Sequence, residues 1–361
     1  MVLNRDEILK VLGLIIEPDL KKDIVSANLI DTLEIIDGKV KLRVLISNPA
    51  MHARKRMSEA INFNLKREFS ENLIVDLEVA GMSSESKSTF RKILPEVKNI
   101  IAIASGKGGV GKSTATVNIA AGLTKLGHRV GIVDADIYGP SIPTMLDVFD
   151  KKPDMIDIDG VPKINPVLSY GIKILSIGFF TEQDSAVVWR GPMASKALTQ
   201  MFTDAYWGEL DYLLIDLPPG TGDIHLSLVQ TVPLDGAIIV STPQEVALAD
   251  ARRAINMFNL DSINIPVIGL MENMSWFTPE ELPENKYYIF GRDGAKNLAL
   301  GMGVPFLGHI PLIQSVRESA DVGRPAVFQE KTMISNLFDK LVVNLVEQID
   351  LSKEKNKKNV N

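Results

Sequence analysis

The chain has 361 residues, of which 45% are hydrophobic and 23% are charged, and its formal net charge is −6. This composition is typical of a soluble globular protein with one or two domains, and the acidic balance argues against nucleic acid as the main partner. The sequence contains no cysteine, which excludes disulfides, thiolate nucleophiles and thiolate metal ligands. No apolar run approaches the roughly 18 residues of a membrane span, and the N-terminus lacks a signal-peptide core. We therefore expect a cytoplasmic protein without stable membrane association.

Residues 1–80 predict a small α+β domain. The predicted elements, in order, are a helix at 5–14, strands at 29–36 and 40–45, a helix at 49–69 and a strand at 73–79. The first two strands are joined by Asp37-Gly38, which is a strong hairpin signal. Elements in this order form a sheet whose apolar face packs against two helices.

A larger α/β domain is predicted from residue 98 to residue 350. Gly81–Lys87 is small and polar, so residues 81–97 are predicted to be a linker. The apolar strand patterns that follow are 100–104, 130–133, 172–177, 212–215, 237–240 and 267–271, with helical patterns between most of them. Continuous apolar strands indicate a mostly parallel sheet flanked by helices, with ligands at the carboxyl ends of the strands. An amphipathic helix at 333–349 closes the domain, and residues 351–361 are predicted to be a charged flexible tail.

The glycine-rich stretch from Gly106 to Thr114 lies between an apolar strand and a predicted helix at 115–126. This is the context of a phosphate-binding P-loop, because backbone N–H groups and the helix N-terminus then surround the phosphates. Lys112 is predicted to reach the β- and γ-phosphates, and Ser113 to give Mg²⁺ an oxygen ligand. The predicted nucleotide-binding residues of the loop are Gly106, Lys107, Gly108, Gly109, Val110, Gly111, Lys112, Ser113 and Thr114.

Three acids at strand ends complete a predicted Mg²⁺-dependent phosphoryl-transfer site. Asp216 follows the apolar strand Leu213–Ile215, as in a Walker B element, and would hold Mg²⁺. Asp134 and Asp136 are two positions apart, so in an extended chain their side chains share a face, and their repulsion favours a bound cation. We assign Asp136 to the attacking water and Asp134 to the outer shell of the metal, although these two roles can be exchanged.

Several motifs resemble one known family. Lys107-Gly108-Gly109-Val110-Gly111-Lys112-Ser113 resembles the deviant Walker A motif of the MinD/ParA class of P-loop ATPases. The stretches Asp134–Pro143, Trp189–Met193 and Asp216–Asp223 resemble the Mrp family of iron–sulfur cluster carriers, also called ApbC. Residues 1–80 resemble the small domain often fused ahead of it, with Ile16-Glu17-Pro18-Asp19 matching the opening motif of that domain.

The resemblance implies a homodimeric ATPase with ATP and Mg²⁺ as cofactors, which assists iron–sulfur cluster assembly or transfer to apo-proteins. Lys107 would reach across the dimer to the phosphates of the partner, so that Lys107, Lys112 and Asp136 are the expected catalytic residues. Ser113, Asp134 and Asp216 are the expected metal ligands. Asn273, after the strand at 267–271, matches the asparagine that reads adenine, since an amide can both donate and accept.

One departure from the family pattern leaves two functions open. The carriers place a CxxC pair shortly after this asparagine, whereas Met274–Glu280 offers no sulfur ligand except the poor thioether of Met274. A cluster is therefore possible by resemblance but without cysteine ligands from this chain, and a partner protein could supply them. The alternative is a nucleotide-switched scaffold like MinD and ParA, which binds partner proteins without carrying a cluster.

Overall fold

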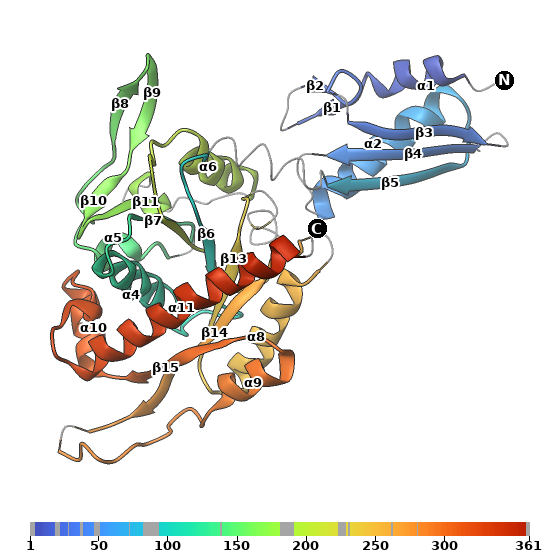
Figure 1. Ribbon diagram of the computed structural model, residues 1–361. Coiled ribbons are helices and arrows are strands. Elements are labelled where there is room, and N and C mark those ends of the chain that lie inside the picture. The colour runs from blue at the N-terminus through green and yellow to red at the C-terminus, as the bar shows by residue number, and fades with distance from the viewer. Residues whose placement is uncertain are drawn as a thin grey trace. The chain divides into compact units, whose positions relative to one another are not determined.

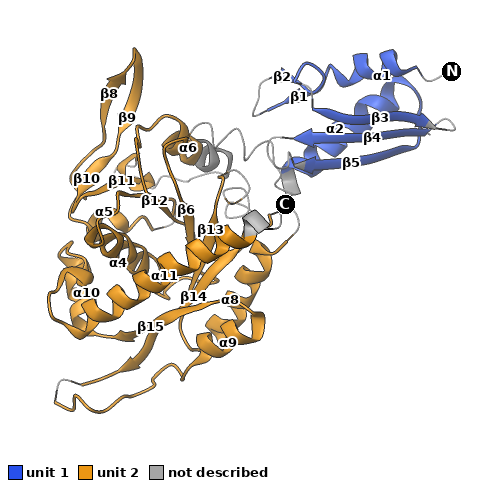
Figure 2. Cartoon of the chain, in the orientation of Figure 1, with its two compact units in different colours: residues 1–90 blue, residues 91–361 orange. Residues whose placement is uncertain are grey.

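The computed structural model describes residues 4–18, 22–27, 29–36, 39–46, 51–71, 73–81, 94–137, 139–180, 191–222, 229, 232–260, 263–279 and 281–358. The chain divides into two compact units, residues 1–90 and residues 91–361 (Figure 2). Most of the predicted linker at 81–97 lies outside the described residues, so its boundaries stay a prediction. Leu94 and Val97, at its end, are buried in the core of the larger unit.

The first unit is a small sheet domain, as the sequence predicts. Its elements are α1 (Arg5–Leu12), β1 (Ile16–Glu17), β2 (Lys22–Asp23), β3 (Ile30–Ile36), β4 (Lys39–Ile46), α2 (Met51–Glu68) and β5 (Val75–Gly81). In the three-stranded sheet, β4 pairs antiparallel with β3 and parallel with β5. Every second residue of β4 is buried, from Val40 to Ile46, and joins one core with α1 and α2. The predicted turn at Asp37-Gly38 lies outside the described residues.

The second unit is built on one large sheet. Its elements are β6 (Ile100–Ala104), α4 (Lys112–Lys125), β7 (Val130–Asp134), α5 (Ile142–Met145), β8 (Asp154–Ile158), β9 (Val161–Asn165), β10 (Val167–Ser169), β11 (Ile172–Ser176), η1 (Ile177–Phe180), α6 (Gly191–Thr203), β12 (Tyr212–Asp216), β13 (Gly236–Ser241), α8 (Glu245–Phe258), β14 (Val267–Phe277), α9 (Gly294–Met302), β15 (Phe306–Leu312), α10 (Gln314–Asp321), η2 (Ala326–Phe328) and α11 (Met333–Lys358). Figure 1 shows how these helices surround the sheet.

The eight strands of this sheet follow the order β10-β11-β7-β12-β6-β13-β14-β15. All neighbouring pairs are parallel except β10 with β11, which confirms the predicted mostly parallel sheet. Side chains of β6 alternate between two cores: Ile100, Ala102 and Ala104 pack with α6, α8 and α9, while Ile101 and Ile103 pack with α4 and α11. Burial on both faces is the reason why this strand is apolar throughout.

Several elements differ from the sequence prediction. Strand β14 continues to Phe277, whose backbone N–H and C=O each bond to Tyr287 at 2.8 Å, so Asn273 lies inside the strand and not after it. Helix α11 continues to Lys358, which replaces the predicted tail over residues 351–358 with a helical segment rich in Lys and Glu. Strand β15 and the β8–β9 pair were absent from the predicted set.

In the part of the chain that the structure describes, no helix combines the length and the apolar character needed to cross a bilayer.

Candidate nucleotide site

The glycine loop connects β6 to α4, and glycine is required at several of its positions for different physical reasons. Gly109 and Gly111 have φ angles of 80° and 84°, in the left-handed region that favours glycine. A Cβ atom at Gly106 would lie 2.2 Å from the carbonyl carbon of Asp250, so only glycine lets α8 pack directly on the loop. Nothing lies within 4 Å of a Cβ built at Gly108, which is exposed. The backbone of the loop is therefore fixed on one side by α8 and is open on the other.

The carboxylate of Asp216, at the end of β12, is the centre of the site. It is fully buried and accepts hydrogen bonds from the Lys112 ammonium (2.7 Å) and the Ser113 hydroxyl (2.6 Å) at Oδ2, and from the Thr116 hydroxyl (2.6 Å) at Oδ1. A buried carboxylate is costly unless it is paired and hydrogen-bonded, and these donors meet that need. The structure therefore brings together three of the residues that the sequence assigned to phosphate and Mg²⁺: Lys112, Ser113 and Asp216.

Asp136 and Asp134 lie in different surroundings. The Asp136 carboxylate is 3.5 Å from the Lys112 ammonium. The Asp134 carboxylate is fully buried and accepts hydrogen bonds from the Ser176 hydroxyl (2.8 Å) and from the backbone N–H groups of Asp136 and Ile142 (both 3.3 Å). Burial, and after it the nearby Asp216 charge, raise the pKa of Asp134 to about 8. Asp134 thus organises the backbone of the loop that carries Asp136, and its place in the metal shell stays a prediction.

Asn273 contacts the P-loop itself. Its side-chain Nδ2 donates to the Val110 carbonyl at 2.9 Å, and a Cβ atom at Gly111 would lie only 2.2 Å from that nitrogen. Gly111 is therefore required both by its φ angle and by the approach of Asn273. The contact of Asn273 with adenine stays a prediction.

Lys107 is half-buried, and its backbone carbonyl is bound by Ser105, the first residue after β6. The Ser105 hydroxyl donates to the Lys107 carbonyl at 3.0 Å. The Ser105 carbonyl in turn accepts from the Gly220 N–H at 2.9 Å, which ties the loop after β12 to the start of the P-loop. The contact of Lys107 with the phosphates of a partner subunit involves a second copy of the chain, and it stays a prediction. Trp189, Arg190 and Asp223, which belong to the family motifs, lie outside the described residues.

Sequence reasoning missed Thr116 and Ser176. Thr116 lies on α4 four residues after Lys112 and three after Ser113, which places all three on neighbouring turns of one helix face. That spacing was a usable signal. Ser176 ends β11 next to β7, and only the strand order brings it to Asp134.

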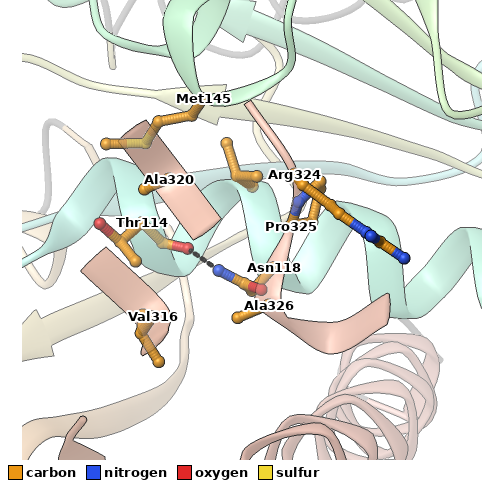
Figure 3. A pocket seen from close by; sticks show the side chains of 9 residues that line it. Thr114, Asn118, Met145, Val316, Ala320, Arg324, Pro325 and Ala326 are labelled. Atoms are coloured by element: carbon orange, nitrogen blue, oxygen red, sulfur yellow. Dashed lines mark hydrogen bonds between the residues drawn. The ribbon is translucent and has the colours of Figure 1, made fainter. Parts of the chain in front are cut away.

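A small hollow lies beside α4, between α10 and η2 (Figure 3). It encloses about 180 Å³ of empty space but has no room for a water-sized sphere. Thr114 is the only P-loop residue among those that line it: Thr114, Val117, Asn118, Met145, Val316, Ala320, Arg324, Pro325 and Ala326. In this conformation the hollow is a packing gap and not a ligand site.

Oxygen donors of the described site fit a hard divalent cation. Mg²⁺ prefers carboxylate, hydroxyl and phosphate oxygens. Asp216 Oδ2 and Ser113 Oγ are 2.6 Å apart and both belong to the site that the P-loop forms. Lys112 adds a buried positive charge at the same place, as a phosphate chain requires.

Two family models and a similar protein identify the family of this chain. A family model described as ParA, NUBPL iron-transfer P-loop NTPase, matches residues 96–346, and one described as iron-sulfur cluster assembly protein matches residues 5–71. An iron-sulfur cluster carrier protein of Synechocystis sp. is 41% identical over 333 residues, which cover 91% of this chain and 93% of that protein. These matches confirm the resemblance seen in the motifs.

Solved structures show the same fold. A nucleotide-binding protein from Archaeoglobus fulgidus in complex with ADP is 37% identical, with a TM-score of 0.58, and the match covers 66% of this chain and 91% of that one. The cell division ATPase MinD from Pyrococcus furiosus is 21% identical, with a TM-score of 0.52, over 69% of this chain and 98% of that one. On the family match over most of the chain and the 41% identity, the chain belongs to the ParA family of NUBPL-type iron-transfer P-loop NTPases.

Proposed function

We propose that this chain is a Mg²⁺-dependent ATPase that works as a homodimer and assists iron–sulfur cluster assembly or transfer to apo-proteins. The observation that carries the ATPase part is the convergence of Lys112 and Ser113 on the buried Asp216 carboxylate. Ser113 and Asp216 would hold Mg²⁺, with Asp134 next to them, and the P-loop backbone from Gly106 to Thr114 would hold the phosphates. Bound Mg²⁺ would supply positive charge that neutralises the phosphates.

Lys112 and Asp136 have complementary tasks in this proposal. The ammonium of Lys112 is now neutralised by Asp216 at 2.7 Å and lies 3.5 Å from Asp136. A phosphate chain in the loop would take over the ammonium, and the Asp136 carboxylate, 3.5 Å from that ammonium, would accept a hydrogen bond from the attacking water. Asp134 is fully buried and accepts from two backbone N–H groups of its own loop and from the Ser176 hydroxyl at the end of β11, so we place Asp136 and not Asp134 at the water.

A cluster would be cargo, and the described residues of this chain do not fit it as ligands. The sequence has no cysteine. Within the described ranges, no group of three or more His, Cys, Asp and Glu side chains is placed to hold a metal ion. In the segment after Asn273, the Lys286 ammonium lies 4.3 Å from the centre of the Trp276 ring, and Phe277 pairs with Tyr287. We therefore propose that cluster thiolates come from the client or donor protein.

The test is anaerobic cluster transfer. The purified chain is added with ATP and Mg²⁺ to a cluster donor and an apo-enzyme, and iron, sulfide and recovered enzyme activity are measured. We expect ATP-dependent stimulation of transfer and no stoichiometric iron on the chain itself. Transfer that is the same with and without the chain would contradict the proposed cluster role.

A nucleotide-switched scaffold is the second candidate, and the absence of cysteine favours it. In that case ATP would change binding to partner proteins with no effect on cluster transfer. A pull-down experiment separates the two functions. The chain is immobilised in the presence of ATP or of ADP, and its binding of purified cluster-assembly proteins is measured. ATP-dependent binding to these proteins together with stimulated transfer supports the carrier proposal, and ATP-dependent binding without transfer supports the scaffold.

A further inference from the structure

The Asp216 carboxylate has two differently used oxygens. Oδ2 accepts from Lys112 and Ser113, the residues that would bind phosphate and Mg²⁺. Oδ1 accepts from the Thr116 hydroxyl at 2.6 Å, inside the protein. Oδ2 thus faces the residues that would bind the ligand, whereas Oδ1 is bound by a side chain of α4.

Thr116 has no exposed surface, and its hydroxyl has two acceptors within reach. These are Asp216 Oδ1 at 2.6 Å and the Lys112 carbonyl at 3.1 Å. A hydroxyl has one hydrogen to donate, and an ionised acceptor at the shorter distance forms the stronger bond. The hydrogen therefore goes to Asp216, and the contact with the Lys112 carbonyl adds a second polar neighbour.

Two of the three donors to Asp216 would change partner when Mg²⁺ and nucleotide bind. Ser113 would give its oxygen to the metal, and Lys112 would turn to the phosphates, as set out above. Thr116 lies on the next turn of α4 with no exposed surface, and its hydroxyl contacts the Lys112 carbonyl and Asp216 Oδ1. It is the donor that stays on the carboxylate in both states.

We propose that Thr116 is a positioning residue: its hydroxyl fixes Asp216 through Oδ1, so that Oδ2 keeps the direction needed for Mg²⁺. This inference rests on the proposed Mg²⁺-nucleotide site. It assigns no contact between Thr116 and the substrate. Loss of the hydroxyl should weaken the use of Mg²⁺ and leave the Mg²⁺-free affinity for nucleotide in place.

Two substitutions separate the hydroxyl from the packing. Thr116→Val keeps the shape of the side chain and removes the hydroxyl, whereas Thr116→Ser keeps the hydroxyl and removes the methyl group. The matched control is Thr124→Val on the same helix, because the Thr124 hydroxyl bonds only to the Ala120 carbonyl at 3.0 Å among the described contacts.

The measurement is binding of a fluorescent ADP analogue to the full chain, with Mg²⁺ varied and with EDTA, alongside ATP hydrolysis. Since a hydrogen bond to a charged group is worth more than a neutral one, Thr116→Val should raise the Mg²⁺ concentration for half-maximal binding about tenfold. Its affinity in EDTA should stay within about twofold of the wild type, and Thr116→Ser should restore most of the Mg²⁺ dependence.

Different results overturn different claims. Equal Mg²⁺ dependence of Thr116→Val and the wild type, or a Thr116→Ser variant as impaired as Thr116→Val, would reject the positioning role. Wild-type binding that ignores Mg²⁺ altogether would instead reject the proposed metal site. Circular dichroism reports whether Thr116→Val folds, and Thr116→Ala provides a second variant without the hydroxyl for the same comparison.

Discussion

At the scale of single residues, the site is a small set of charges that neutralise one another. Asp216 accepts from Lys112, Ser113 and Thr116, and the Lys112 ammonium also lies 3.5 Å from Asp136. All of these groups except Ser113 are buried, so each would be costly without its partner. The same side chains that would bind nucleotide therefore also stabilise the protein without it.

Lys112→Ala should abolish ATP hydrolysis, with a loss of at least about 100-fold, because the ammonium that would neutralise the phosphates is gone. Phosphate release assays with purified protein measure it. Lys125→Ala is the matched control, since it removes an ammonium from the other end of α4, where Lys125 binds Asp339 at the surface. Unchanged turnover in Lys112→Ala would contradict the assignment of the site.

Gly111→Ala should impair both folding stability and nucleotide binding. The new Cβ would lie 2.2 Å from Asn273 Nδ2, at a φ of 84° that alanine adopts only with strain. We expect a loss of about 1–3 kcal/mol in the free energy of unfolding, measured by urea denaturation. Gly301→Ala serves as the control, because nothing lies within 4 Å of its Cβ in α9 and alanine favours a helix there. A Gly111→Ala variant as stable as the wild type would show that Asn273 does not restrict this position.

At the scale of elements, charged groups join the amino ends of three central strands, at the opposite ends of these strands from the site. Asp211, just before β12, accepts from the Lys98 ammonium at 2.8 Å and from the Arg129 backbone N–H at 2.9 Å. These hydrogen bonds hold the pKa of the Asp211 carboxyl well below its usual range, and the bond from Lys98 has the largest effect. This joins the chain segments that precede β6, β7 and β12, which are neighbours in the sheet.

Asp211→Asn should destabilise the protein at neutral pH and much less in acid. The lowered pKa means that the ionised carboxylate stabilises the fold above about pH 4, and this stabilisation is lost as the pH falls through the pKa of the folded state. Urea denaturation of the wild type and of Asp211→Asn at pH 7 and at pH 3 measures the effect. The difference in the free energy of unfolding should be smaller at pH 3 than at pH 7, and it should vanish only below the lowered pKa of the folded state. A difference that stays constant with pH would mean that Asp211 acts through packing.

At the scale of the whole molecule, the two units have separate cores. Apolar residues of α1, α2 and the small sheet form one cluster, and both clusters on the large sheet come from residues after 90. The predicted catalytic and nucleotide-binding residues, from Gly106 to Asn273, all lie in the second unit. Lys107 is the one whose predicted partner lies in a second copy of the chain.

Lys107→Ala should weaken ATP-dependent dimerisation without a comparable loss of nucleotide binding. Light scattering in the presence of a non-hydrolysable ATP analogue measures the dimer, and a fluorescent nucleotide measures binding. We expect the wild type to dimerise with the analogue and the variant to remain mostly monomeric at the same concentration. Lys151→Ala, at an exposed position, is the control. A wild-type chain that stays monomeric with the analogue would contradict the proposed homodimer.

The fold class was predictable because its signals are local. Apolar runs buried on both faces identified the parallel sheet, and the strand-loop-helix context identified the P-loop. The length of β14 was not predictable in this way, because the residues after Met271 pair with β15, which comes more than 30 residues later in the chain. The placement of Asn273 inside that strand follows from its pairing with Ile310 of β15.

The sequence by itself determined the chemical inventory of this protein: the loop from Gly106 to Thr114, the acids at positions 134, 136 and 216, and the complete absence of cysteine. These features depend only on residue types and on short spacings along the chain, which are the same in the unfolded and the folded protein. Only the tertiary structure decided which partners these groups meet. Ser176 reaches Asp134 because β11 lies beside β7, and Thr116 reaches Asp216 because α4 packs over β12. Such contacts join residues many positions apart, so the sheet order and the helix packing decide them.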